Sequence, residues 1–98
     1  MEKLALLVTL QAKKGKETEV ENFLKGGLAI VQGEPGTKQW YALSLGDGKY
    51  GIFDSFDDEE GRNAHLNGKV AAALMAQAGD LFSTPPSIEK VDLLAVKS

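Results

Sequence analysis

The hydrophobic positions along the chain change period several times, and each change marks a new element. Residues 3–12 carry apolar side chains on both alternating sets of positions, which is typical of a strand covered on both faces. From Lys16 to Val31 the apolar positions recur at helical spacing. Gly26 and Gly27 lie within this segment, so either the helix is interrupted there or it approaches a sheet closely.

Turn residues separate the elements of the middle of the chain. The GEPG run at residues 33–36 ends the helix, and a strand is predicted over residues 37–45. Residues 46–48, of sequence GDG, indicate a hairpin, since Asp-Gly accepts the positive φ that tight turns need. The strand predicted over residues 50–56 therefore returns antiparallel to the one before it.

A second helical region follows in two pieces. We expect Asp57 to cap its start, with Glu60 three residues on as in a capping box, and residues 67–68 to end the first piece. The second piece is predicted over residues 69–78, with Gly79 as its cap. After the prolines that stop it, a last strand is predicted over residues 88–96.

The order of elements is strand, helix, strand, strand, helix, strand. It predicts an α+β fold in one domain, residues 1–98: a ferredoxin-like βαββαβ four-stranded antiparallel sheet with its helices on one face. The other face is then too apolar to be left in water. Its apolar positions are Ala5, Leu7, Val91, Leu93 and Ala95. The simplest cover for this face is a second copy, so we expect a homodimer.

Composition narrows the function classes. The formal net charge of −3 and the lack of a basic cluster argue against nucleic acid and against an anionic membrane as partners. The absence of cysteine excludes disulfides and thiolate chemistry. No apolar run reaches membrane-spanning length, and the N-terminal residues are typical of a first strand rather than a signal peptide. We expect a cytoplasmic protein.

Candidate chemistry centres on His65, the only histidine. A neutral imidazole suits proton abstraction near neutral pH, or it could anchor a phenolic oxygen. The alternative is a histidine that is hydrogen-bonded under the helix or at a dimer contact. Asp54 could orient His65 or pair with another neighbour. We predict no metal site, because one histidine and a run of capping acids at residues 57–60 cannot supply a ligand cluster.

Aromatic residues surround this stretch. Trp40, Phe53 and Phe56 could form the walls of a pocket for a flat substrate, or they could belong to the core. Asn63 could donate a hydrogen bond to a substrate carbonyl.

Three motifs resemble the antibiotic biosynthesis monooxygenase family: EPGT at residues 34–37, FDSFDD at 53–58 and AHL at 64–66. The resemblance implies a dimeric α+β barrel of two ferredoxin-like protomers packed sheet to sheet. It also implies a pocket between sheet and helices, with His65 at the position of the family's recurrent histidine. Members include oxygenases of quinols or polyketides that need no cofactor, haem-degrading enzymes, and proteins without established activity.

Two positions depart from that pattern. Phe56 stands where the family often has tryptophan at the end of its third strand. At the positions that haem-degrading members use for asparagine, tryptophan and histidine, this chain has Val8, His65 and Met75. None of the three matches, so the resemblance does not extend to haem degradation.

Two hypotheses follow. The first is a monooxygenase that uses neither metal nor organic cofactor and acts on a quinol, polyphenol or similar aromatic substrate with molecular oxygen. Its base would remove a proton, and the protein would supply orientation and a dry cavity. The second is a non-catalytic dimeric barrel that binds a small hydrophobic metabolite, or whose pocket is filled by Trp40 and Met75.

Overall fold

A computed structural model describes residues 1–97, which form one four-stranded sheet and three helices. In chain order the elements are β1 (Leu4–Gln11), α1 (Glu17–Val31), β2 (Thr37–Gly46), β3 (Lys49–Phe56), α2 (Glu59–Leu66), α3 (Lys69–Leu81) and β4 (Ser87–Asp92). The strands lie in the order β2-β3-β1-β4, and every neighbouring pair is antiparallel. The predicted α+β class and βαββαβ layout are confirmed.

The predicted hairpin joins β2 to β3. Its turn takes positive φ at Gly46, Asp47 and Gly48, as the GDG sequence predicted. Trp40 of β2 pairs directly with Asp54 of β3. Because side chains alternate along a strand, these two residues share one face of the sheet.

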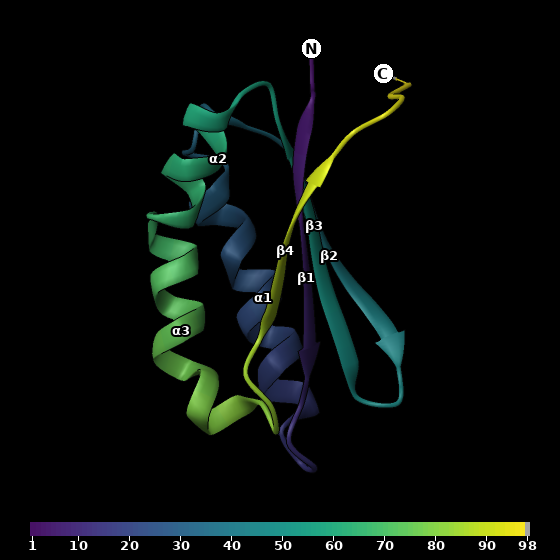
Figure 1. Ribbon diagram of the computed structural model, residues 1–98. Coiled ribbons are helices and arrows are strands. Elements are labelled where there is room, and N and C mark those ends of the chain that lie inside the picture. The colour runs from purple at the N-terminus through teal and green to yellow at the C-terminus, as the bar shows by residue number, and fades with distance from the viewer. Residues whose placement is uncertain (98) are drawn as a thin grey trace.

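The helices cover a single face of the sheet (Figure 1). The core lies between them and the two inner strands, β1 and β3. Its fully buried members include Val8, Leu10, Val20, Leu24, Ile52 and Leu74. Leu6, Val8 and Leu10 of β1 thus face the helices. Leu7 and Thr9 between them are exposed, so the predicted covering of both faces of this strand is not seen within one protomer.

The two glycines of α1 have different roles, and the helix is not interrupted at either of them. A Cβ at Gly27 would lie 3.4 Å from the ring of Trp40, whereas a Cβ at Gly26 would meet no atom within 4 Å. Of the two positions, only position 27 lies close enough to the sheet for a Cβ to contact it.

Three predicted boundaries are wrong. The cap of α2 is Asp58, whose carboxylate accepts from the amide of Gly61 at 2.9 Å; Asp57 instead forms an ion pair with Lys38. Helix α3 runs through Gly79 to Leu81, since nothing there breaks its hydrogen bonds. Strand β4 ends at Asp92 rather than Val96, because its neighbour in the sheet, β1, begins at Leu4, the residue that pairs with Asp92.

The second face of the sheet carries no helix within residues 1–97 (Figure 1). Tyr41 and Phe53 stack on this face with ring centroids 6.5 Å apart, and Tyr41 is 51% exposed. Leu7 is 38% exposed beside them. Of the apolar positions expected here, Ala5 is already buried, Val91 and Leu93 are partly exposed, and Ala95 is exposed.

Candidate functional site

Helix α2 carries the candidate histidine against the top of the sheet. The Asp58 cap begins the helix, and His65 lies in its last turn, where positive charge is favoured by the helix dipole. Arg62 stands three residues earlier on the same face, and both side chains are buried. Arg62 donates from Nη1 to the carbonyl oxygens of Ala5 and Val91 at 3.3 and 3.4 Å, and it pairs with Glu59. These contacts hold α2 on β1 and β4.

His65 lies between two carboxylates. Its Nδ1 is 2.5 Å from Oε1 of Glu34, and its Nε2 is 2.9 Å from Oδ2 of Asp54. The ring of Phe56 lies 5.5 Å away, centroid to centroid. Only 7% of the His65 side chain and 1% of the Asp54 side chain are exposed. We call Glu34, His65 and Asp54 the histidine cluster.

Opposing effects set the protonation of the histidine. Burial disfavours the imidazolium, but the contacts with Asp54 and Glu34 favour it and together outweigh the burial, so the pKa of His65 is raised. With a charged ring, both nitrogens donate. The cluster then holds one cation between two anions in a poorly hydrated place.

Glu34 comes from the turn between α1 and β2. Its Oε1 also accepts a hydrogen bond from the hydroxyl of Thr37 at 2.8 Å. Its Oε2 lies against Gly68, where a Cβ would be 3.1 Å away. Glycine at position 68, in the junction between α2 and α3, therefore leaves space for the carboxylate.

Four buried polar atoms in and around the cluster have no hydrogen-bond partner within residues 1–97: Oδ1 and Oδ2 of Asp54, Nε1 of Trp40 and Nε of Arg62. Oδ2 of Asp54 instead has the ion-pair contact with Nε2 of His65 at 2.9 Å. Because Asp54 and Trp40 pair across β3 and β2, an unsatisfied acceptor and an unsatisfied donor occupy neighbouring positions on the same face. The chain thus leaves hydrogen-bonding capacity beside the histidine that a hydroxyl group could satisfy.

The largest hollow near the cluster measures about 420 Å³ and has Glu34 in its wall. We call it the Glu34 hollow. Its lining residues are Ile30, Gly33, Glu34, Ala64, Gly68 and Lys69. Ala64 precedes His65 in the sequence, and the Glu34 carboxylate both lines the hollow and contacts the imidazole.

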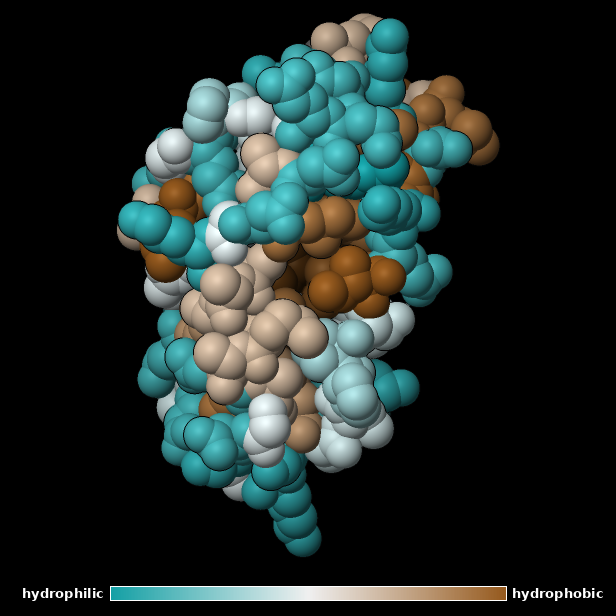
Figure 2. All heavy atoms as spheres, turned by 60° about the vertical axis from the view of Figure 1, so that its left-hand side comes forward, coloured by the Kyte–Doolittle hydropathy of each residue, from teal (hydrophilic) through white to brown (hydrophobic). Residues whose placement is uncertain are grey.

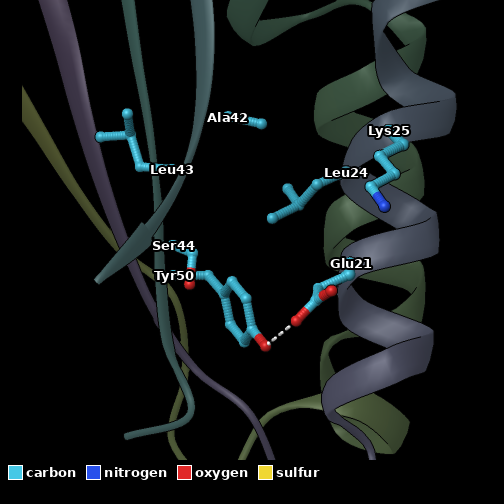
Figure 3. Close-up of a pocket in the computed structure, with 7 residues that line it drawn as sticks. All are labelled: Glu21, Leu24, Lys25, Ala42, Leu43, Ser44 and Tyr50. Atoms are coloured by element: carbon cyan, nitrogen blue, oxygen red, sulfur yellow. Dashed lines mark hydrogen bonds between the residues drawn. The ribbon is translucent and has the colours of Figure 1, made fainter. Parts of the chain in front are cut away.

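A second hollow, of about 220 Å³, lies between α1 and the β2–β3 hairpin (Figure 3). We call it the Tyr50 groove. Its lining residues are Glu21, Leu24, Lys25, Ala42, Leu43, Ser44 and Tyr50. Leu24 and Ala42 face each other across it (Figure 3). At its end the hydroxyl of Tyr50 donates to Glu21 at 2.6 Å. This hydrogen bond, with burial and the charges of Glu21 and Glu17, raises the pKa of Tyr50 to about 12.

The site residues predicted from the sequence do not converge on one cavity. Asp54 and Phe56 contact His65, and Trp40 is the neighbour of Asp54. Phe53 lies on the opposite face of the sheet, stacked on Tyr41. Asn63 is exposed on α2.

Trp40 and Met75 do not share the filling of a pocket. Trp40 packs against Gly27 and the core, but Met75 is 57% exposed. Met75 lies instead in an apolar hollow of about 210 Å³ with Leu66, Ala71 and Ile88. Figure 2 shows hydrophobic walls around a hollow on the helical side of the molecule.

Four residues that contribute to these sites were not identified from the sequence. Glu34 was interpreted only as part of a turn and a family motif, although a lone acid in a turn ahead of a strand is free to reach a distant cation. Arg62 gave no signal, since arginine on a short polar helix is usually exposed. The partners Glu21 and Tyr50 are 29 positions apart, beyond any local pattern.

Within residues 1–97 no group of three or more potential ligands among His, Cys, Asp and Glu is arranged to hold a metal ion. In the same part of the chain, no helix combines the length and the apolar character needed to cross a membrane.

The proteins that this chain resembles are known from solved structures. No protein-family model matches it, and no curated protein does. The crystal structure of a protein of unknown function from Nitrosomonas europaea is 54% identical, with a TM-score of 0.97. That match covers 100% of this chain and 95% of the other.

Two further structures share the fold at lower identity. A protein from Caulobacter crescentus assigned as an antibiotic biosynthesis monooxygenase is 21% identical, with a TM-score of 0.82 over 96% of this chain and 92% of its own. A protein from Nitrosomonas europaea with the same assignment is 14% identical, with a TM-score of 0.82 over 94% and 90%. At these identities the similarity concerns the fold alone.

Proposed function

Because the chain belongs to the same family as the Nitrosomonas europaea protein of unknown function and has the fold of the antibiotic biosynthesis monooxygenases, we propose that it oxygenates a small aromatic substrate. The shared fold confirms the resemblance predicted from the sequence motifs. The substrate class is a quinol, a polyphenol or a similar phenol, and the second substrate is molecular oxygen. Neither a metal nor an organic cofactor takes part.

The reaction begins with removal of the phenolic proton. The substrate anion gives one electron to O₂, and the two radicals combine to form a carbon–oxygen bond at a ring carbon that carries hydrogen. The peroxide anion takes the proton back from the base, and the resulting hydroperoxide loses water and leaves a carbonyl group. One oxygen atom of O₂ ends in the product and the other in water, so the reaction needs no external reductant.

In this proposal the neutral form of His65, with its proton on Nε2 toward Asp54, receives the phenolic proton on Nδ1. The supporting observation is that Nε2 of His65 lies 2.9 Å from the fully buried Asp54, while Nδ1 points to the wall of the Glu34 hollow. A carboxylate on one nitrogen fixes the ring and stabilises the imidazolium that forms, which is how a buried acid assists a histidine base. Asp54 is thus the positioning residue.

Neighbouring residues would complete the substrate site. Trp40 and Phe56 would support it from behind, since both lie beside the histidine cluster on the helix-covered face but neither lines the Glu34 hollow. Phe53 and Asn63, also predicted as substrate contacts, lie elsewhere in this protomer: Phe53 on the open face and Asn63 exposed on α2. They could reach a substrate only through a rearrangement or a second copy.

The homodimer is part of the same proposal. Two copies packed through the face that bears Leu7, Tyr41 and Phe53 would remove these side chains from water. Each square ångström of apolar surface buried contributes about 25 cal/mol. The pairing matches the sheet-to-sheet arrangement that the family resemblance implied.

Oxygen uptake tests the oxygenase proposal. Purified protein is mixed with a panel of quinols and polyphenols, with and without a metal chelator. We expect consumption of O₂ that is unchanged by the chelator, and incorporation of one labelled atom from ¹⁸O₂ into the product. Turnover that a chelator abolishes and one metal restores, or no uptake with any substrate, contradicts it.

Binding without turnover is a second candidate function. Both ring nitrogens of the only histidine already contact carboxylates, whereas the Tyr50 groove offers the apolar walls of Leu24 and Ala42. In that case a small hydrophobic metabolite would occupy the groove. Leu24→Lys should then abolish binding of the metabolite. Neither the wild-type protein nor this variant should take up oxygen.

A further inference from the structure

Two hydrogen-bond donors converge on a single oxygen atom in the histidine cluster. The hydroxyl of Thr37 lies 2.8 Å from Oε1 of Glu34, and Nδ1 of His65 lies 2.5 Å from the same atom. The donors come from different elements, β2 and α2. Donors fixed by separate elements and aimed at one point form the arrangement by which proteins bind an anionic oxygen.

The present occupant of this position is a side chain that could leave. Glu34 lies between α1 and β2, in a turn rather than in a helix or strand, and 20% of its side chain is exposed. Its carboxylate rests against Gly68, the residue without a side chain at the start of α3. Rotation of Glu34 toward solvent would open the donors to the Glu34 hollow without moving any strand.

The Glu34 hollow fits a small aromatic molecule. At about 420 Å³ it is larger than the other hollows described above. Pockets for small ligands usually measure about 300–1,000 Å³. Ile30 and Ala64 supply apolar walls, and Lys69 supplies a cation at the rim.

We propose that Glu34 is an internal occupant of an oxyanion site, and that a phenolate binds in the Glu34 hollow by replacing the Glu34 carboxylate on Thr37 and His65. The exchange of one anion for another leaves the charge of the cluster unchanged, and Asp54 stays on Nε2 of His65. This inference rests on the proposed function, whose substrate it places.

Displacement of an internal competitor weakens the apparent affinity of a ligand, because the open state is only a small fraction of the population. Glu34→Ala should therefore bind 4-nitrophenolate at least about tenfold more tightly than the wild-type protein does. Glu60→Ala, which removes an exposed acid from the adjacent helix, is the control for net charge and should leave the affinity unchanged. Titration is followed by the absorbance of the phenolate, at a mildly alkaline pH.

Further variants locate the bound oxygen. Adding Thr37→Val to Glu34→Ala removes one donor and should cost about tenfold in affinity. The neutral ether 4-nitroanisole should bind no more tightly to Glu34→Ala than to the wild-type protein. Glu34→Gln keeps the size of the side chain without its charge, so it serves if Glu34→Ala does not fold, and it should also bind the phenolate more tightly than wild type.

Equal phenolate affinity in wild type, Glu34→Ala and Glu34→Gln overturns the inference, as does insensitivity to Thr37→Val. These measurements involve no turnover and so stand apart from the oxygenase test. Tighter binding with no oxygen uptake would support the oxyanion site and contradict the oxygenase. Oxygen uptake together with equal phenolate affinities in the three proteins would support the oxygenase and contradict the oxyanion site.

Discussion

Gly36 and Gly61 touch backbone to backbone. A Cβ at Gly36 would lie 2.9 Å from Cα of Gly61, and a Cβ at Gly61 would lie 2.9 Å from the carbonyl oxygen of Gly36. Gly36 belongs to the turn that carries Glu34, and Gly61 belongs to the helix that carries His65. The contact of the two glycines therefore sets the separation of the turn and the helix on which the Glu34–His65 ion pair depends.

We predict that Gly36→Ala destabilises the protein by about 1–3 kcal/mol, the usual cost of inserting a methyl group where backbone blocks it. Gly26→Ala is the control, since a Cβ there meets open space in a helix. It should stabilise by about 0.5–1 kcal/mol. Urea unfolding of the two variants measures both effects. A Gly36→Ala protein as stable as wild type would show that the turn and α2 can separate freely.

Removal of the imidazole should cost stability. His65→Ala leaves the fully buried Asp54 without its cation and empties the space beside Phe56. An unpaired buried group costs about 1–3 kcal/mol, so the melting temperature should fall clearly. Asn63→Ala, on the exposed side of the same helix, should melt close to wild type.

Turnover separates the catalytic role of His65 from its structural one. If the proposed oxygenase uses this base, His65→Ala should lower the rate by roughly a hundredfold or more at temperatures where the variant is still folded. The oxygen electrode measures it on the samples used for melting. If His65→Ala keeps its oxygen uptake although its melting temperature is lowered, His65 is not the catalytic base.

The free energy of unfolding should depend on pH through His65. Its folded-state pKa is raised, while that of the unfolded chain is about 6.5. Its stabilising contribution is thus complete below about pH 6.5 and is lost as the pH rises through the folded-state pKa. Unfolding in urea at a series of pH values should show this decline in wild type. Asp54→Asn and Glu34→Gln, which remove the anions that favour the imidazolium, should each flatten it; an unaltered slope in both would contradict the prediction.

Charge on the open face should disrupt the dimer. Leu7→Glu or Leu93→Glu places a carboxylate where the proposed interface excludes water. The dimer should dissociate, and the separated protomer should be less stable than the protomer in the dimer. Met75→Glu is the matched control, because Met75 is exposed on the helical side. Light scattering at micromolar concentration gives the mass. A monomeric wild-type protein would refute the interface, and so would dimers of both interface variants.

Local patterns predicted most of the elements because their causes are local. A GDG turn takes positive φ because of its own residue types. The change from alternating to helical period after β1 located α1, and the same change after β3 located the end of that strand. The errors arose where two local signals competed or where a neighbour decided. Asp57 and Asp58 are equally good helix caps by residue type. In the folded chain Asp58 has the extended backbone of a cap, and its side chain accepts the hydrogen bond from the amide of Gly61. Strand β4 ends opposite the first residue of its partner β1, which its own sequence does not encode.

The sequence by itself determined the α+β layout, the single histidine and the presence of apolar residues such as Leu7 on the second sheet face, because periodicity and composition suffice for each. Only the tertiary structure decided what surrounds that histidine. Glu34 stands 31 positions from His65, and the two meet because the end of α1, the start of β2 and the end of α2 lie near the same edge of the molecule. Ion pairs of this kind depend on how elements pack rather than on any period, so the carboxylates on both sides of His65 emerge only when the chain is folded.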